Sequence, residues 1–202
     1  VEDAAPSSGA KYKNKKTGTF ADITCFSFGP TKPLGCIGGS GGITGSKEIC
    51  NRAREIREHG KRVSTKRDNF ETLGWNRNPH SIQMAFLLAK LPYLNELNDK
   101  KRHLALRYND LLKDVVNNIP KEQTDRYHPY YLYSILVDRR DELKEYLEKK
   151  NIESLIHWQV GAHEFPFTTS ANGKLPVTRL ITRQTLSLPC HSFLRRDEQD
   201  HV

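Results

Sequence analysis

The feature that most constrains this chain is a short apolar strand that stops abruptly at a Gly-Pro pair. Residues 23–28 are β-branched and aromatic, a composition typical of a buried strand. Proline cannot donate to a neighbouring strand, so the strand must end at Gly29-Pro30 and a loop must begin there. This loop carries Lys32, close behind the end of the strand. The chain therefore holds an amine where a sheet edge and a loop meet.

Other segments near this loop have a less regular pattern. Residues 35–45 hold six glycines, which favours a bend or a close backbone approach over a regular packed element. Residues 1–5 are typical of the end of a strand and place Asp3 at that end. Asn78-Pro79 matches an N-cap followed by the first residue of a helix, which puts Asn76 just before that helix.

Helical spacing of apolar residues predicts three helices in the first two thirds of the chain. One begins after Ser46 and ends at Gly60, one follows Pro79, and a longer one runs from Leu94 to about residue 117 after an interruption at Pro92. Beyond Pro120 the pattern predicts a β-α-β module. Its parts are a strand over 131–137, a helix capped by Asp138 and a strand over 154–158, and the tail adds a helix near 177–183, a strand over 185–188 and a helix after Phe193.

The charge balance favours anionic partners without choosing among them. Lys and Arg number 32 against 24 Asp and Glu, a formal net charge of +8, which suits phosphates, nucleotides or nucleic acid. The longest apolar run, residues 84–89, is far too short to span a membrane. The four cysteines form no Cys-x-x-Cys pair, which favours free thiols and a cytoplasmic protein. Because the chain opens without Met and stops inside a charged helical pattern, we expect it to be a fragment.

Lys32 is the residue around which a catalytic hypothesis can be built. A lysine in a loop after a buried strand can form a Schiff base when desolvation or nearby positive charge activates it, and such a lysine anchors pyridoxal 5′-phosphate (PLP) in enzymes. Residue type alone favours a solvated surface lysine. By the same standard Asp3 and Asn76 are typical turn residues. The Ser27 hydroxyl fits a hydrogen bond to backbone as well as it fits a phosphate ligand.

Two other classes of function have weaker support. A nucleic-acid-binding module would depend on Lys61-Arg62 and Lys66-Arg67 with the net positive charge, but no aromatic stacking platform is interleaved with them. Cys190-His191 lacks metal-ligand spacing, so no metal site is predicted. The glycines of residues 35–42 match neither a dinucleotide fingerprint nor a phosphate loop.

Several motifs occur in an order that is specific in combination and cover almost the whole chain. This order resembles the DegT-type (DegT/DnrJ/StrS) family of sugar aminotransferases, which are PLP enzymes of fold type I. The motifs that carry the resemblance are Val1-Glu-Asp-Ala-Ala5, Asp22-Ile, Cys25-Phe-Ser27-Phe, Pro30-Thr-Lys32-x-Leu-Gly, Gly74-Trp-Asn76, residues 83–91, 107–112, 128–137 and 152–157, and Leu186-Ser-Leu-Pro189.

The resemblance implies a role for each candidate site residue. Asp3 pairs with the pyridine nitrogen of PLP, Ser27 binds its phosphate, and Lys32 forms the Schiff base and moves the proton. Asn76 reaches the phosphate bound in the partner subunit of a homodimer with shared active sites. His157 and His163 lie near the region that borders the sugar, although a histidine at a strand end is more often structural or exposed.

The sequence departs from the family pattern at positions close to the expected site. Pro6 and Ser8 stand where the family usually has Gln and His near the cofactor, and Gly39 replaces an acidic residue of the glycine-rich segment. Asn78 and Ser81 replace an Arg and an acidic residue. These changes affect the expected fine positioning of cofactor and substrate.

The resemblance also implies a fold and an activity. Residues 1–75 would form the end of a large α/β domain with a parallel sheet, and residues 76–202 a helical linker and a small α+β domain. The implied reaction moves an amino group from an amino acid, usually glutamate in this family, to a keto group of a nucleotide-linked sugar. Since the family's earlier portion supplies the rest of the sheet and the aromatic residue that stacks on the ring, we expect the fragment alone to be inactive.

Overall fold

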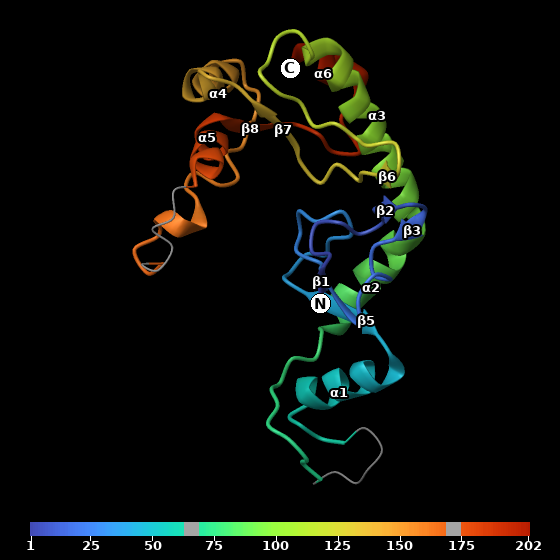
Figure 1. The fold of residues 1–202 in the computed structure, drawn as a ribbon. Helices are drawn as coiled ribbons and strands as arrows, with labels where there is room; N and C mark the ends of the chain where they lie inside the picture. Colours follow the sequence, from blue (N-terminus) through green and yellow to red (C-terminus); the bar gives the residue numbers. More distant parts are fainter. Residues whose placement is uncertain (63–68, 169–174) are drawn as a thin grey trace. The chain divides into compact units, whose positions relative to one another are not determined.

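The computed structural model describes residues 1–62, 69–168 and 175–202, which divide into two compact units (Figure 1). The first unit consists of Val1–Asn98 and Gln123–Tyr131. The second consists of Asp99–Glu122 and Leu132–Val202. The chain therefore returns once to its first unit before it completes the second. The expected domain boundary after residue 75 stays a prediction.

The first unit contains a three-stranded sheet in the order β1-β4-β5. β1 (Glu2–Asp3) runs parallel to β4 (Ile23–Ser27), with Asp3 opposite Cys25. Because the two strands are parallel, their carboxyl ends lie at the same edge. Both predicted strands are thus confirmed, and the last residue of each is a candidate site residue.

The expectation for the glycine-rich segment was wrong in one respect. β5 (Gly41–Gly45) is a regular strand that pairs antiparallel with all of β4, from Ile23 opposite Gly45 to Ser27 opposite Gly41. Backbone pairing needs no side chain, and here the missing side chains make room. A Cβ at Gly42 would lie 3.0 Å from the Phe28 ring, so the glycine lets that ring cover the strand.

A second small sheet of the first unit joins β2 (Lys11–Tyr12), β3 (Lys15–Lys16) and β6 (Arg126–Tyr127) in the order β3-β2-β6. Lys13 and Asn14 connect β2 to β3 with φ of 47° and 62°, the left-handed conformation of a two-residue hairpin. The pairing of β2 with β6 brings the segment Gln123–Tyr131 to the first unit.

Helices follow the sheet much as their capping residues predict. α1 (Lys47–Arg57) begins after Ser46, whose side chain accepts the Ile49 N–H, as expected. α2 (Ser81–Lys90) begins later than the predicted cap at Asn78, because the His80 ring accepts the Ile82 N–H at 3.3 Å and serves as the N-cap. The short 3-10 helix η1 (Leu91–Tyr93) contains Pro92, and α3 (Leu94–Leu112) follows at once.

The second unit is built around the antiparallel pair β7 (Tyr133–Leu136) and β8 (Thr185–Leu188). The predicted strand over 154–158 is reduced to one bridge between Leu155 and Ser187. Asp138 does not cap the next helix, because its carboxylate accepts from Asn117 and Gln184 side chains instead. The helices are α4 (Arg140–Lys149), η2 (Ala162–Glu164), α5 (Pro176–Gln184) and α6 (Arg196–His201).

The core of the second unit includes two tyrosines whose hydroxyls find partners. The rings of Tyr108 and Tyr133 contact each other in a tilted arrangement, with centroids 4.9 Å apart. Tyr133 donates to Asn109 Oδ1 at 2.8 Å and Tyr108 to the Pro189 carbonyl at 3.1 Å. Burial raises the pKa of the nearby Cys190 thiol to about 11, so that thiol stays protonated at neutral pH and is a poor nucleophile.

The loop after β4 folds back on itself and is sealed by an apolar cluster. Leu34, Cys36 and Leu87 are buried together, with Met84 and Leu94 packed against them. The Cys36 N–H donates to the Phe28 carbonyl at 3.0 Å. Outside the cluster, the Lys90 ammonium donates to the Gly35 carbonyl at 2.6 Å. These contacts anchor the far end of the loop that carries Lys32.

Gly35 allows the loop to close, and this gives a first testable prediction. A Cβ there would lie 2.5 Å from the Gly29 carbonyl oxygen and 2.6 Å from that of Pro30, whereas a Cβ at Gly39 meets nothing within 4 Å. We expect Gly35→Ala to lower the free energy of unfolding by about 2 kcal/mol or more, and Gly39→Ala to change it by less than about 0.5 kcal/mol. Urea unfolding measures both. Equal effects of the two variants would contradict this account of the loop.

Candidate active site

Asp3 and Ser27 lie at the carboxyl ends of the two parallel strands. The register places Asp3 opposite Cys25, two residues before Ser27 on β4. Side chains two residues apart on a strand share a face of the sheet, so Asp3, Cys25 and Ser27 face the same side. The Asp3 Oδ1 atom accepts the Ala5 N–H at 3.0 Å, which orients the carboxylate. Within the described residues its other oxygen has no partner.

Ser27 and Lys32 flank a position without a side chain. A Cβ at Gly29 would lie 3.7 Å from Ser27 Oγ and 3.8 Å from Lys32 Cγ. The Ser27 hydroxyl already accepts the Gly29 N–H at 3.4 Å, and the Lys32 N–H donates to the Gly29 carbonyl at 3.0 Å. Both side chains are half-buried. The loop therefore brings the Ser27 hydroxyl and the aliphatic part of the Lys32 side chain to the same glycine.

Tyr131 also contributes to this site and was not predicted. Its hydroxyl lies 3.0 Å from Thr31 Oγ1, and the Lys32 ammonium lies 4.5 Å from the centroid of its ring. Tyr131 is 100 residues from Thr31 in sequence. The sequence placed Tyr131 at the start of a strand, and nothing local in the pattern joined it to the lysine loop.

Asn76 lies on a different segment of the first unit, and it is exposed. It forms an isolated bridge with Glu58 just beyond α1. The segment lies close to α1 because Gly60 and Gly74 approach without side chains: a Cβ at Gly74 would lie 2.1 Å from the Gly60 nitrogen. Within the described residues no contact joins Asn76 to Ser27 or Lys32. Its predicted role in a partner subunit is therefore untested.

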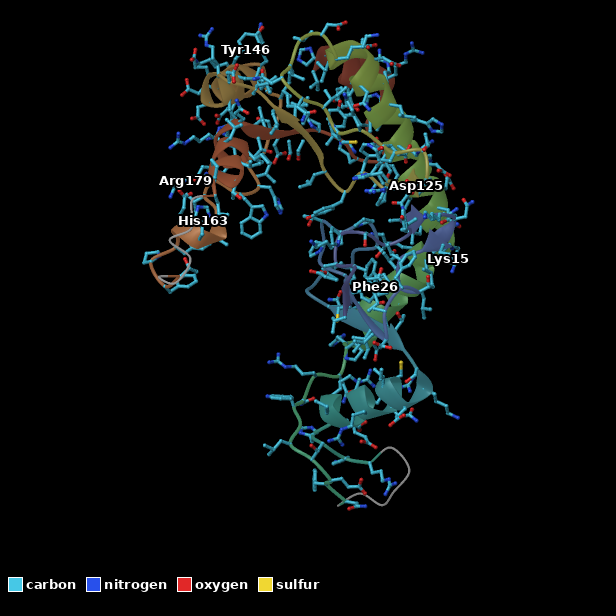
Figure 2. All side chains as sticks on the ribbon, viewed as in Figure 1. Lys15, Phe26, Asp125, Tyr146, His163 and Arg179 are labelled. Atoms are coloured by element: carbon cyan, nitrogen blue, oxygen red, sulfur yellow. The ribbon has the colours of Figure 1, made fainter. Side chains whose placement is uncertain are left out.

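The two histidines named as substrate residues belong to the second unit. His157 is exposed and meets the Trp158 ring edge-on, with centroids 5.5 Å apart. His163 lies on η2, close to α5 (Figure 2), where Arg179 forms an ion pair with Glu164 at 3.2 Å. The Nε2 atom of His163 is buried and has no hydrogen-bond partner within the described residues. Their proposed contact with a sugar stays a prediction.

The positions that depart from the family pattern differ in their surroundings. Ser8 is buried, with its backbone carbonyl accepting from Asn98 at 3.0 Å. Pro6 and Asn78 are exposed, and Gly39 stands in open space. The Ser8 side chain is therefore packed in the interior of the unit.

The basic residues behind the nucleic-acid alternative are only partly described. Lys61 lies over the Phe70 ring at 5.4 Å, and Arg62 forms an ion pair with Glu71 at 3.0 Å. Lys66 and Arg67 lie outside the described residues. Both described cations therefore have partners within their own segment, and no observation favours a nucleic-acid surface there.

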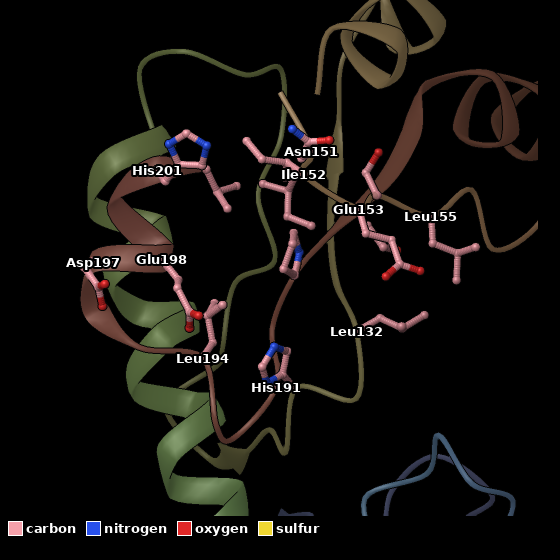
Figure 3. A pocket seen from close by; sticks show the side chains of 15 residues that line it. Leu132, Asn151, Ile152, Glu153, Leu155, His191, Leu194, Asp197, Glu198 and His201 are labelled. Atoms are coloured by element: carbon pink, nitrogen blue, oxygen red, sulfur yellow. The ribbon is translucent and has the colours of Figure 1, made fainter. Parts of the chain in front are cut away.

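A cavity of about 620 Å³ opens in the second unit, between the 151–155 segment and α6 (Figure 3). Glu153, His191, Asp197, Glu198 and His201 contribute polar groups to its lining. None of the predicted site residues is among the described residues that line it. Over the described ranges, no three His, Cys, Asp or Glu side chains are grouped to hold a metal ion.

No helix in the described part of the chain is long and apolar enough to cross a lipid bilayer.

Comparison with known proteins gives one consistent result. The sequence profile of the DegT/DnrJ/EryC1/StrS aminotransferase family matches residues 1–202. A dTDP-3-amino-3,4,6-trideoxy-alpha-D-glucose transaminase of Streptomyces venezuelae is 33% identical over 98% of this chain and 53% of that protein. The chain spans about half the length of the curated relatives it matches.

Solved structures agree with the sequence comparison. The crystal structure of a DegT DnrJ EryC1 StrS aminotransferase from Brucella abortus is 36% identical, with a TM-score of 0.92 over 98% of this chain and 54% of that one. The structure of S. venezuelae DesV in complex with a ketimine intermediate is 32% identical, with a TM-score of 0.89 over 97% and 53% of the two chains.

Proposed function

Because this chain belongs to the DegT/DnrJ/EryC1/StrS aminotransferase family and has its fold type I architecture, we propose that it serves a PLP-dependent amino transfer. The amino group would pass from an amino acid, with glutamate as the donor, to a keto group of a nucleotide-linked sugar. The transaminase activity named for the S. venezuelae relative supports the class of acceptor.

The spacing of Asp3, Ser27 and Lys32 is the observation that carries this proposal. Asp3 lies opposite Cys25 on the neighbouring strand, so Ser27 is two residues further along β4, a rise of about 7 Å along the strand direction. A pyridine ring with its phosphate arm spans a length of this order. The Lys32 side chain and the Ser27 hydroxyl border the same glycine, since a Cβ at Gly29 would lie 3.8 Å from Lys32 Cγ and 3.7 Å from Ser27 Oγ. The donor set thus fits PLP: carboxylate, hydroxyl and amine.

Each residue would contribute a different action. Bound PLP supplies an electron sink for the bond broken at the donor's α-carbon. The Asp3 carboxylate would keep the ring nitrogen protonated. Its Oδ1 atom accepts the Ala5 N–H, so Oδ2 would be the atom that pairs with the ring nitrogen. The Ser27 hydroxyl would donate to a phosphate oxygen. Lys32 Nζ would carry the cofactor and then take the proton from the donor's α-carbon.

We further propose a cytoplasmic homodimer with shared sites, in which residues 1–75 belong to the large domain. All four cysteines are free thiols, in keeping with a reducing compartment. Asn76 is exposed and forms a bridge with Glu58, and within the described residues it makes no contact with the Lys32 loop of its own chain. In a two-fold assembly such a residue can complete the partner's site, and symmetry repeats the contact.

Lys32 is the first test of the proposal. Borohydride reduction of the full-length protein saturated with PLP is expected to fix the cofactor on Lys32, and glutamate is expected to convert bound PLP to its amine form. Lys32→Ala should abolish both results, since the variant removes the amine that would join the cofactor. Peptide mass mapping and absorbance measure them. Lys47→Ala, at the exposed start of α1, is the control, and a reducible adduct at this site in Lys32→Ala would refute the assignment.

Ser27 provides a second test because its proposed partner is a charged phosphate. A hydrogen bond to a charged group contributes about 1.5–3 kcal/mol, so Ser27→Ala is expected to weaken PLP binding about tenfold or more. Binding of pyridoxal, which lacks the phosphate, should be unchanged. Fluorescence titration with both ligands measures the difference. Ser40→Ala, in the same loop region, should leave both affinities unchanged, and parallel losses for PLP and pyridoxal in Ser27→Ala would argue against a phosphate contact.

Sharing of the sites can be tested by mixing inactive variants. A heterodimer of Lys32→Ala and Asn76→Ala would hold one doubly damaged site and one intact site. Random exchange makes about half of the dimers mixed, so activity should recover toward about a quarter of wild type. Assays before and after subunit exchange measure the recovery. Demonstrated exchange of two inactive parents without recovery would rule out shared sites.

A further inference from the structure

The Lys32 ammonium rests on the face of an aromatic ring. Its Nζ atom lies 4.5 Å from the centroid of Tyr131, well within the range of a cation–π attraction. No carboxylate of the described residues forms an ion pair with Lys32. The Tyr131 ring therefore attracts this charge, and it lies in the same compact unit as Lys32.

A second contact fixes the ring relative to the lysine. The Tyr131 hydroxyl and Thr31 Oγ1 are 3.0 Å apart, and Thr31 directly precedes Lys32. The ring is thus hydrogen-bonded to one residue of the loop and stacked under the side chain of the next. A lysine side chain has many rotamers to lose on ordering, and this two-point contact restricts them.

The segment that carries Tyr131 is itself held in place. β6 pairs with β2, and the Lys13 N–H donates to the Asp125 carbonyl at 2.7 Å. Tyr130 is fully buried, and its N–H donates to His128 Nδ1 at 2.8 Å. Tyr131 therefore belongs to a segment whose backbone is held by the pairing of β6 with β2 and by the hydrogen bonds at Asp125 and Tyr130.

We propose that Tyr131 is a positioning residue, whose ring holds the Lys32 ammonium beside the site whenever the amine is not joined to the cofactor. This inference rests on the proposed function. The ring attracts the charged form and not the neutral amine, so it retains Lys32 after the lysine has taken a proton and releases it when the proton is given up. Thr31 acts through Tyr131 by fixing the ring.

Nuclear magnetic resonance tests the contact without any activity. Reductive methylation with ¹³C-formaldehyde labels the lysines of the protein without cofactor, and Lys32→Arg assigns the Lys32 signal. A group over the face of an aromatic ring is shielded, so this signal is expected upfield of those from exposed lysines. Tyr131→Phe and Thr31→Val both remove the hydrogen bond that fixes the ring and should reduce the shift, and Tyr131→Leu should abolish it. A wild-type Lys32 signal at the position of exposed lysines overturns the proposal.

Kinetics tests the consequence for the reaction. With glutamate as donor, Tyr131→Leu is expected to lower kcat about two- to fivefold, the size of an exposed cation–π contact, and to leave KM for glutamate unchanged. Tyr131→Phe should retain more activity than Tyr131→Leu. Tyr127→Leu removes another ring of the same unit, one that lies under Lys11 at 5.4 Å, and should change neither kcat nor the Lys32 signal.

The two readouts separate this inference from the proposed function. A shifted Lys32 signal in a protein that forms no reducible PLP adduct would support the contact and refute the function. An adduct at Lys32 with a kcat and a signal that Tyr131→Leu leaves unchanged would support the function and overturn the role of Tyr131. Should Tyr131→Leu fail to fold, the wild-type signal and Thr31→Val still decide the outcome.

Discussion

The close approach of the Gly35 backbone to the carbonyls of Gly29 and Pro30 is the constraint on which the candidate site depends. It closes the turn after β4, and a side chain at Gly35 would strike both carbonyl oxygens. Once the turn is closed, Leu34 and Cys36 reach the apolar cluster beside α2. The polar residues of the loop then remain outside it. The site is therefore shaped first by backbone contacts and only then by side chains.

The sequence predicted the parts of this arrangement that depend on local chemistry. The strand before Gly29-Pro30, the cap at Ser46 and the short strand that ends in Asp3 all follow from residue type and are confirmed. Asp3 and Ser27 come together because a parallel pair has one carboxyl edge. This much of the site needs no contact between distant residues beyond the pairing of two strands.

The predictions that failed depended on competition between partners. Asp138 is a good helix cap by residue type, but two distant side chains, Asn117 and Gln184, occupy its carboxylate. Asn78 was predicted to cap α2, but the His80 ring serves as its N-cap. The glycines of β5 are poor strand formers, yet complete pairing with β4 decides their conformation. At Asp138 and in β5 a contact with a distant segment overrode a local preference, whereas at α2 one local cap replaced another.

The distance in sequence between Thr31 and Tyr131 has a consequence for how the protein is made. A ribosome adds residues in order, so the loop with Lys32 leaves it long before the segment that ends at Tyr131. During that interval β6 does not yet exist to pair with β2, and the lysine has no ring beneath it. Contacts between residues so far apart form late and slow folding. Because Tyr131 is the last residue of the first unit, the contact that positions the amine can form only after the whole unit has been made.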